Sequence, residues 1–452
     1  MQTIHAMNPQ SDVPLKHTAE SRVRWERRLL LVTVIIVCTG VLAKAGVSLK
    51  PYLDMPVRSL RKDIDWGLLN GGLAQIHDFH DTGRWWVSTW CGQVPFWRPL
   101  TSYALWAEWL IWPKEYLLPR QIVLILTHLC FTALAAALLW RLTRRPWLVL
   151  LSIYLFAGLR PYQPGGPQAY ILPVNDLLMD PKNLPDPLVG LAIVGSLLLL
   201  TRRRWLAALG LAAVSVGFKE TGFTTWPLAV LIVAWMYRDR VFARGGIGYV
   251  LASVRRNRIP IAAWSGAFLL LLFVRYMTVG MGYQQGSNSF WSWRVLAFLG
   301  GSVLQNLMLD RTAVFMACAL FAAVLLSHRS RLIWKFAALL MALTLGIGAD
   351  AWMQHTAWTV SATRIIYMGQ SVGATALCIL WLAVIWMSRS DWRHVALGVV
   401  MALVAGAPSW MAAQTWAHTR YTASVFLEMA LAAIIIQNIK NIGGYLAGLR
   451  RR

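Results

Sequence analysis

The run IVLILTHLCFTALAAALLW, at residues 122–140, decides the fold of this chain, because it contains no Asp, Glu, Lys or Arg. A helix needs about 20 mainly apolar residues to cross the hydrocarbon core of a membrane, and this run has that length and composition. Comparable runs recur along the chain, in which 57% of residues are hydrophobic and the mean hydropathy is +0.51. The 25 tryptophans favour the boundary between lipid and water. The sequence therefore predicts an all-α, polytopic integral membrane protein.

The net charge of the chain, +24 at neutral pH, follows the predicted topology. In a soluble protein such a balance would suggest a nucleic-acid partner, but here the cations lie between hydrophobic runs. Alternate connections hold 26 of the 43 Lys and Arg residues, at 1–28, 141–146, 202–204, 238–258, 328–335, 388–393 and 438–452. The positive-inside rule makes these pieces cytoplasmic, together with both termini. We therefore expect the lipid bilayer as a partner and no nucleic acid.

Hydropathy, charge and proline positions predict about twelve membrane-spanning helices. They lie near 29–49, 120–140, 147–159, 187–201, 205–218, 223–237, 259–278, 312–327, 335–350, 365–387, 394–413 and 421–437. The domains are a cytoplasmic tail at 1–28, a membrane domain at 29–437 and a basic cytoplasmic tail at 438–452. We interpret 294–309 as re-entrant or interfacial, because a span there would place the basic run 328–335 outside.

The largest predicted outer loop, at 50–119, is where we expect the active site, because function concentrates in large loops. Smaller outer loops lie at 160–186 and 279–311. Within the first loop, residues 100–112 follow Pro99 and have apolar positions three and four apart, which predicts an amphipathic helix. Such a helix would lie in the membrane interface rather than cross it.

Arg98 stands just before this interfacial helix, in the segment Phe96-Trp97-Arg98-Pro99. A guanidinium beside the free N–H groups and positive end of a helix suits a phosphate group. The alternative is an arginine that anchors the loop or pairs with an aspartate.

The same loop is rich in acids, among which Asp63 and Asp65 stand two apart. Paired carboxylates can serve as a general base or hold a divalent cation, although nothing in the sequence requires a metal. Asp65 is favoured as the base because apolar residues follow it closely. The alternative for each aspartate is a role in capping a helix or turn.

The segment Lys219-Glu220-Thr221-Gly222 places two opposite charges in a short outer turn between apolar runs. Charges this close to hydrocarbon are costly unless they are paired or used. The functional interpretation makes Lys219 a phosphate ligand and Glu220 its orienting partner or a second acid. The structural interpretation is a neighbouring ion pair in a turn formed by Gly222.

Arg364 and Tyr367 open a late span, and this outer arginine is a further candidate for a phosphate contact; snorkelling to the interface is the alternative. The chain contains no Walker A motif, no GxGxxG after a strand, no HExxH and no zinc-like Cys/His spacing. His77 and His80 stand three apart in a polar loop, but we predict no metal there.

In order along the chain, these features resemble the GT-C superfamily of polytopic glycosyltransferases, which includes enzymes like the protein O-mannosyltransferases and bacterial relatives. The resemblance rests on short motifs within residues 29–370: Asp63 and Asp65, Arg98-Pro99-Leu100, His128 in the second span, Lys219-Glu220-Thr221-Gly222 with Pro227, and Arg364 with Tyr367. The aspartates are separated by one residue where many relatives have an adjacent pair.

The resemblance implies transfer of a sugar from a polyprenyl-phosphate carrier to an acceptor on the outer face of the membrane, with inversion at the anomeric carbon. Asp65, or else Asp63, would deprotonate the acceptor hydroxyl. Arg98, Lys219 and Arg364 would face the carrier phosphate, and Glu220, Tyr367 and His128 would belong to the same substrate- and phosphate-binding set. We expect a bacterial inner membrane, and an acceptor that is a glycolipid, an envelope polysaccharide or a protein.

Two other function classes fit a chain of this kind. A secondary transporter would place ionisable groups near the middle of spans and repeat its first half in its second, whereas the ionisable groups here lie mostly at span ends. A non-catalytic membrane scaffold subunit would tolerate the loss of every acid named above. Replacing Asp63 and Asp65 distinguishes these two classes, because sugar transfer by an enzyme would depend on the acids and a scaffold would not.

Overall fold

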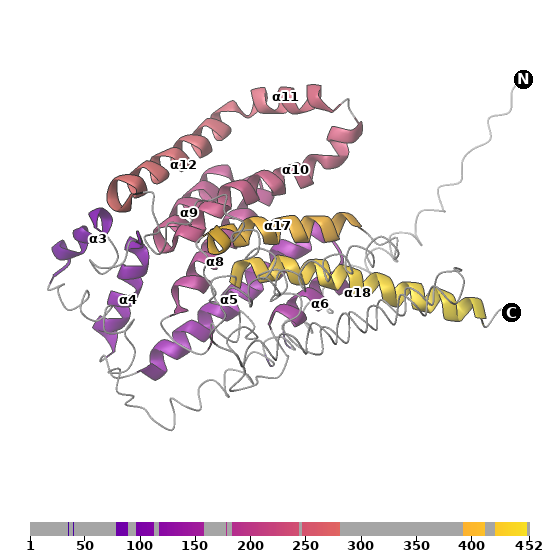
Figure 1. Cartoon of the computed structure of the whole chain (residues 1–452), viewed down its shortest axis with the longest axis horizontal. Helices are drawn as coiled ribbons and strands as arrows, with labels where there is room; N and C mark the ends of the chain where they lie inside the picture. Colours follow the sequence, from indigo (N-terminus) through magenta and orange to yellow (C-terminus); the bar gives the residue numbers. More distant parts are fainter. Residues whose placement is uncertain are drawn as a thin grey trace, which may run out of the picture.

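The computed structural model describes residues 78–88, 96–112, 117–157, 183–243, 246–280, 392–411 and 421–449, together with Ile35, Thr39 and Leu178. All regular structure in these residues is helical, and no strand occurs among them, as the predicted all-α class requires. Figure 1 shows most of the helices gathered in one bundle, with α11 (Ile247–Arg256) and α12 (Arg258–Val279) along its edge.

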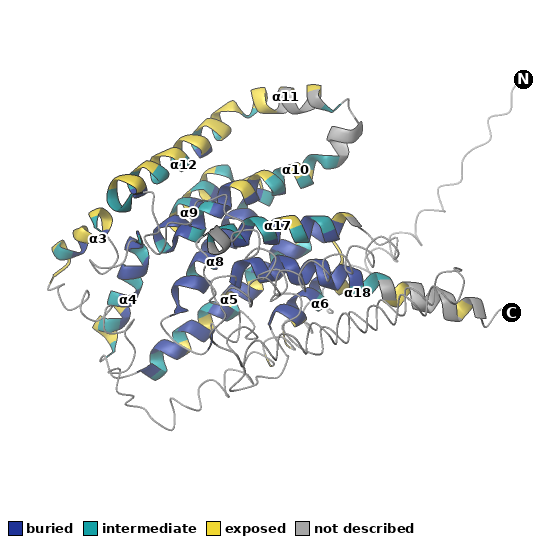
Figure 2. Ribbon diagram, viewed as in Figure 1, coloured by how far each residue is buried: buried dark blue, intermediate teal, exposed yellow. Residues whose placement is uncertain are grey.

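Five apolar helices build the core of the bundle: α5 (Leu117–Thr143), α6 (Pro146–Phe156), α8 (Pro185–Thr201), α17 (Trp392–Met411) and α18 (Tyr421–Leu449). Helix α18 packs along α17 and against α6, and α8 packs against α5. Figure 2 shows α8 and the first half of α18 almost entirely buried. A helix that is apolar on all sides is expected in such a position.

Glycines bring the core helices into close contact. A Cβ atom on Gly190 of α8 would lie 2.7 Å from the ring of Phe131 on α5. A Cβ atom on Gly398 of α17 would lie 2.6 Å from the carbonyl oxygen of Phe426 on α18. Small residues at such positions allow two helix backbones to approach closely, as is common between membrane helices.

A second group of elements packs against these five helices and contributes to the same core. It consists of α9 (Trp205–Phe218), the 3-10 helix η6 (Glu220–Thr224), α10 (Thr225–Ala243) and α4 (Pro99–Ile111), and η3 (His80–Gly83) and α3 (Arg84–Val87) pack near α4. Prolines begin α4, α6 and α8, where the missing N–H of proline has no intrahelical partner to lose. The edge of Trp85 on α3 meets Tyr103 on α4 at 4.9 Å between ring centroids.

Among the described helices, α5 and α12 are long and apolar enough to cross a membrane, with 27 and 22 residues. Half of the apolar window of α5 is buried in the bundle, but only 11% of that of α12. Leu269, Leu270 and Phe273 of α12 are 62%, 62% and 58% exposed. Shorter apolar helices are α6, α8, α9 and the segments Arg393–Pro408 and Tyr421–Gln437.

Most of the helices predicted from the sequence within the described residues correspond to observed helices. The prediction 205–218 has the bounds of α9, and 120–140, 147–159, 187–201, 259–278 and 394–413 correspond to α5, α6, α8, α12 and α17 with small shifts. The predicted interfacial helix 100–112 corresponds to α4. Predicted spans 312–327, 335–350 and 365–387 and segment 294–309 lie outside the described residues, as does 29–49 apart from the helical Ile35 and Thr39.

Three differences have local causes. The helix predicted at 223–237 is observed as α10, which begins after the 3-10 helix η6 and continues to Ala243. The turn after Lys219 has a 3-10 conformation. Helix α18 passes the polar residues at which its end was predicted and continues to Leu449, since no proline interrupts it. The predicted connection 238–258 contains α11, a short helix with an apolar stripe that hydropathy averaged over a long window does not detect.

Candidate functional site

Arg98 occupies the residue before the first turn of α4. Its backbone is not helical, with φ −136° and ψ 56°, and the helix begins at Pro99. Its carbonyl oxygen accepts hydrogen bonds from the backbone N–H and the hydroxyl of Ser102, each at 3.1 Å. The guanidinium carbon lies 4.1 Å from the centre of the Phe96 ring, so the cation rests on an aromatic face.

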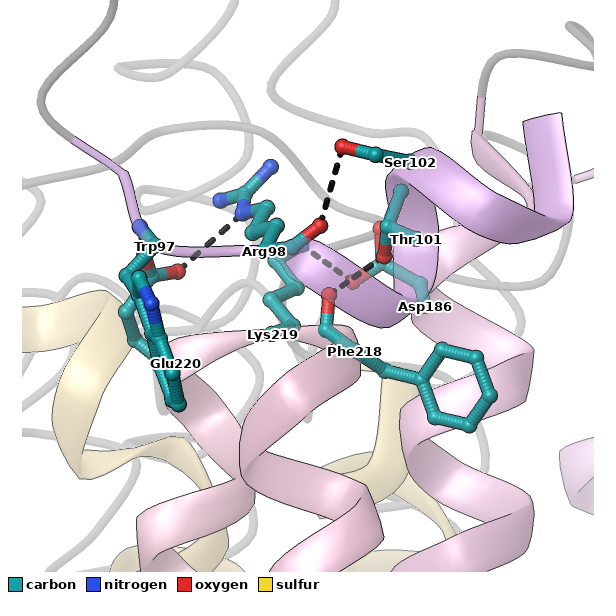
Figure 3. Close-up of polar contacts among 8 residues, drawn as sticks. All are labelled: Trp97, Arg98, Thr101, Ser102, Asp186, Phe218, Lys219 and Glu220. Atoms are coloured by element: carbon teal, nitrogen blue, oxygen red, sulfur yellow. Dashed lines mark hydrogen bonds and ion pairs between the residues drawn. The ribbon is translucent and has the colours of Figure 1, made fainter. Parts of the chain in front are cut away.

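Glu220 binds both Arg98 and the residue before it. One carboxylate oxygen, Oε2, accepts a hydrogen bond from Arg98 Nε at 3.1 Å, and Oε1 accepts one from the backbone N–H of Trp97 at 2.8 Å. The side chains of Arg98 and Glu220 are only 8% and 6% exposed. The segment before α4 is thereby fixed to the 219–222 turn by a buried ion pair (Figure 3).

Lys219 forms a second buried pair with a different acid. Its Nζ lies 2.5 Å from Oδ1 of Asp186, in the first turn of α8. Burial lowers the pKa of the Lys219 ammonium below its ordinary value, and the Asp186 carboxylate opposes this shift. Figure 3 shows the side chains of Lys219 and Glu220 leaving the turn in different directions, toward Asp186 and toward Trp97 and Arg98.

The backbone of the turn is packed against α9. Gly222 N–H donates to the Lys219 carbonyl at 2.8 Å, and Ser215 Oγ on α9 donates to the Gly222 carbonyl at 3.2 Å. A Cβ atom on Gly222 would lie 2.3 Å from the carbonyl carbon of Ser215, so only glycine fits at this position. This close approach sets where Lys219 and Glu220 stand.

Helix α4 is joined to the end of α9 next to the same turn. Thr101 Oγ1 on α4 donates to the carbonyl of Phe218, the last residue of α9, at 2.5 Å. A Cβ atom on Gly217 would lie 2.7 Å from Cδ1 of Leu100, so α4 meets α9 where α9 has no side chain. Arg98 is therefore fixed both by its own side chain and by the helix that follows it.

His128 and Tyr421 form a polar contact inside the core. His128 Nδ1 and the Tyr421 hydroxyl are 2.6 Å apart, and both residues are fully buried. The rings of Phe131 and Phe156 surround them at 4.5 to 5.8 Å between centroids. Asp186 is an electrostatic neighbour of Tyr421, which places this contact beside the Lys219–Asp186 pair.

A further buried acid, Glu108, lies near the end of α4 and is 6% exposed. Burial raises the pKa of its carboxyl to about 7, and the positive charge of Arg120 on α5 works against this shift. Its Oε1 accepts no hydrogen bond from the described residues. Next to Arg120, Gln121 donates to the carbonyl of Leu178 at 2.6 Å, so Leu178 lies at the start of α5.

Of the residues predicted from the sequence, the structure brings Arg98, Lys219 and Glu220 together and places His128 at the neighbouring core contact. The structural alternative that Lys219 and Glu220 pair with each other is wrong, because each pairs with a residue from another element. Asp63, Asp65, Arg364 and Tyr367 lie outside the described residues. Among the described residues, no group of three or more His, Cys, Asp or Glu side chains could hold a metal ion.

Three residues of the site were not predicted from the sequence. Asp186 was assigned to an irregular loop, although its place between Pro185 and Pro187 is typical of a helix start. Tyr421 opens a predicted span, and nothing local marks its hydroxyl as buried. Glu108 had a visible signal, since it is the only acid in α4.

Comparison of the chain with protein-family models, with curated proteins and with solved structures finds no match.

Proposed function

We propose that the chain is a multi-pass membrane glycosyltransferase that moves a sugar from a polyprenyl-phosphate carrier to an acceptor at the outer face of the membrane. In this proposal about twelve helices cross a bacterial inner membrane, both termini are cytoplasmic, and the first outer loop, 50–119, carries the active site. The apolar length of α5 and the exposed apolar surface of α12 support the membrane placement.

The observation that carries the proposal is the fixed position of Arg98 at the start of α4. A guanidinium has five N–H donors, and Glu220 takes the donor at Nε, which orients the whole plane of the group. The positive end of α4 lies beside it. Such a preorganised cation suits the phosphate that leaves during sugar transfer, because it is in place before charge develops.

Lys219 is a second cation next to Arg98, and the carboxylates of Asp186 and Glu220 offset the repulsion between the two. Lys219 is 5% exposed and adjoins Glu220 in the chain, so its positive charge is held close to Arg98. Glu220 and Asp186 act as positioning residues for the two cations. This arrangement also explains how two charges are tolerated next to apolar helices, since each is paired.

In the proposed reaction, Asp65 or else Asp63 takes the proton of the acceptor hydroxyl while the hydroxyl oxygen attacks the anomeric carbon. The bond from that carbon to the phosphate oxygen breaks, and its electron pair leaves with the polyprenyl phosphate. Direct displacement inverts the configuration. Arg98, with Lys219 behind it, and Arg364 beside Tyr367 would neutralise the leaving phosphate.

His128 would support this site from the core through Tyr421 and Asp186, without touching the sugar. The scheme requires no metal, although the acids of the first outer loop would suit a divalent cation.

The test uses the purified full chain in proteoliposomes. We expect Arg98→Gln to weaken binding of polyprenyl phosphate by about ten- to a hundredfold, the range for a lost hydrogen bond to a charged group, and to leave binding of uncharged polyprenol unchanged. Arg98→Lys should retain part of the binding. The matched control is Arg203→Gln, which removes an exposed charge at the other end of α9.

A second arm measures sugar transfer from a panel of polyprenyl-phosphate-linked sugars. The double variant Asp63→Asn/Asp65→Asn should bind polyprenyl phosphate normally and transfer no sugar. Full transfer by the double variant would refute the assignment of the base. If Arg98→Gln weakened the binding of polyprenyl phosphate and of polyprenol equally, Arg98 would have only a structural role.

A further inference from the structure

Helix α11 has an apolar side and a basic end. Its residues Ile247, Val250, Leu251 and Val254 recur three and four apart, which places them on one face; we call them the apolar stripe of α11. The helix ends in Arg255 and Arg256, and Arg258 begins α12 directly afterwards. This combination is typical of helices that lie in the surface of a membrane.

The described side chains at the end of α11 face outward. Figure 1 shows α11 along the edge of the bundle, between α10 and α12, to which it is joined. Val254 is 47% exposed, and Arg255, Arg256 and Arg258 are exposed as well. No ion pair joins these three arginines to a carboxylate in the part of the chain that the structure describes. Arg238 differs, because its guanidinium lies 3.8 Å from the Trp235 ring centre.

The position of α11 at a membrane surface follows from the adjoining helix α12. Only Asn257 separates the two helices, and α12 has the length and exposed apolar surface of a span. The start of α12 therefore lies at a membrane surface, and the segment 238–258 is the most arginine-rich of the connections assigned to the cytoplasmic side. The cytoplasmic leaflet is the one whose anionic lipids attract clustered arginines.

We propose that α11 is a binding site for anionic phospholipids of the cytoplasmic leaflet. Its apolar stripe lies at the boundary between headgroups and acyl chains, and Arg255, Arg256 and Arg258 contact the lipid phosphates. The proposal rests on the membrane placement of α12 and is independent of the sugar-transfer reaction. Lipid is the expected occupant of this site because the exposed arginines continue directly into an exposed apolar helix.

The first experiment titrates phosphatidylglycerol into the full-length protein in detergent and measures binding by native mass spectrometry, with phosphatidylcholine for comparison. We expect Arg255→Gln/Arg256→Gln/Arg258→Gln to lower the affinity for phosphatidylglycerol about fivefold per arginine, or roughly a hundredfold in total. The matched control is Arg202→Gln/Arg203→Gln/Arg204→Gln, which removes three exposed charges from a predicted cytoplasmic turn without an amphipathic helix. It should change the affinity little. Equal affinities in both triple variants would overturn the proposal.

The second experiment places single spin labels at positions 254, 256 and 270 of the protein in phosphatidylglycerol-containing vesicles. We expect labels at 254 and 270 to be accessible to oxygen in the lipid, and a label at 256 to be accessible to a water-soluble relaxant. Dipolar coupling between 254 labels of two copies would show that a second chain covers the stripe and would overturn the proposal. A label at 254 accessible from water would also overturn it, while a water-accessible label at 270 would instead refute the membrane placement itself.

Discussion

At the scale of single residues, the conformation of Lys219 explains the two separate ion pairs. Its backbone is extended, with φ −162° and ψ 150°. Glu220 begins the 3-10 helix η6 directly afterwards, so the backbone direction changes between the two residues. Lys219 and Glu220 therefore diverge, and each needs a partner from another element; α8 supplies Asp186 and the start of α4 supplies Arg98. Adjacent opposite charges in a sequence are thus a poor guide to pairing where the backbone changes direction between them.

Glu108 predicts a pH dependence of stability. The pKa of its carboxyl is about 7 in the folded protein, against an ordinary value of 4.5. Between these values the folded protein keeps the proton that the unfolded chain loses, so stability falls as the pH rises from about 4.5 to about 7 and is level above that. The loss is about 3 kcal/mol. We expect Glu108→Gln to be more stable than the wild type at pH 8, as measured by Tm in detergent.

The control for this prediction is Asp78→Asn, which removes an exposed acid near α4 and should keep the pH dependence of the wild type. If Glu108→Gln shows the same decline of Tm between pH 5 and pH 8 as the wild type, another group is responsible and the prediction is wrong.

At the scale of elements, the site depends on how closely the 219–222 turn meets α9. Gly222→Ala would place a methyl group 2.3 Å from the Ser215 carbonyl carbon and 2.4 Å from its oxygen. These are backbone atoms, so rotating a side chain cannot relieve the overlap. We expect a loss of at least ~2 kcal/mol, seen as a lower Tm, together with weaker binding of polyprenyl phosphate.

Gly210 in α9 provides a matched control. A Cβ atom there meets nothing within 4 Å, and alanine is a better helix former than glycine by about 1 kcal/mol. Gly210→Ala should therefore leave Tm unchanged or raise it slightly. Similar Tm values for the two variants would mean that the turn can move away from α9 without loss.

At the scale of the whole molecule, the distribution of cations predicts that both termini face the cytoplasm. Alternate connections hold 26 of the 43 Lys and Arg residues, and both ends belong to that set. We expect a fluorescent protein fused to either end to fluoresce, and alkaline phosphatase fused to either end to be inactive. A phosphatase fused within the first outer loop, 50–119, should be active. One fluorescent and one phosphatase-active terminus would mean an odd number of spans.

The helices themselves were largely predictable, because apolar runs bounded by charge or proline leave little choice to a chain with few polar residues. Helix α9 has its predicted bounds, and α4 begins one residue before its prediction. Helix α11 was missed because its stripe is short, and η6 because it depends on contact with Ser215. Arg98, Lys219 and Glu220 were candidates from charge alone, since charges beside apolar runs are costly unless they are paired or used.

Within the described residues, the sequence by itself determined that the chain is helical, where most of the helices lie and which charged residues need partners. Those properties follow from local hydropathy and from the cost of placing charge near apolar surface. Only the tertiary structure decided that Arg98 pairs with Glu220, Lys219 with Asp186, and His128 with Tyr421. The partners are far apart in the chain, and close packing at Gly217 and Gly222 positions the turn that carries Lys219 and Glu220. The charged groups of the site were visible in the sequence, whereas their pairing required the fold.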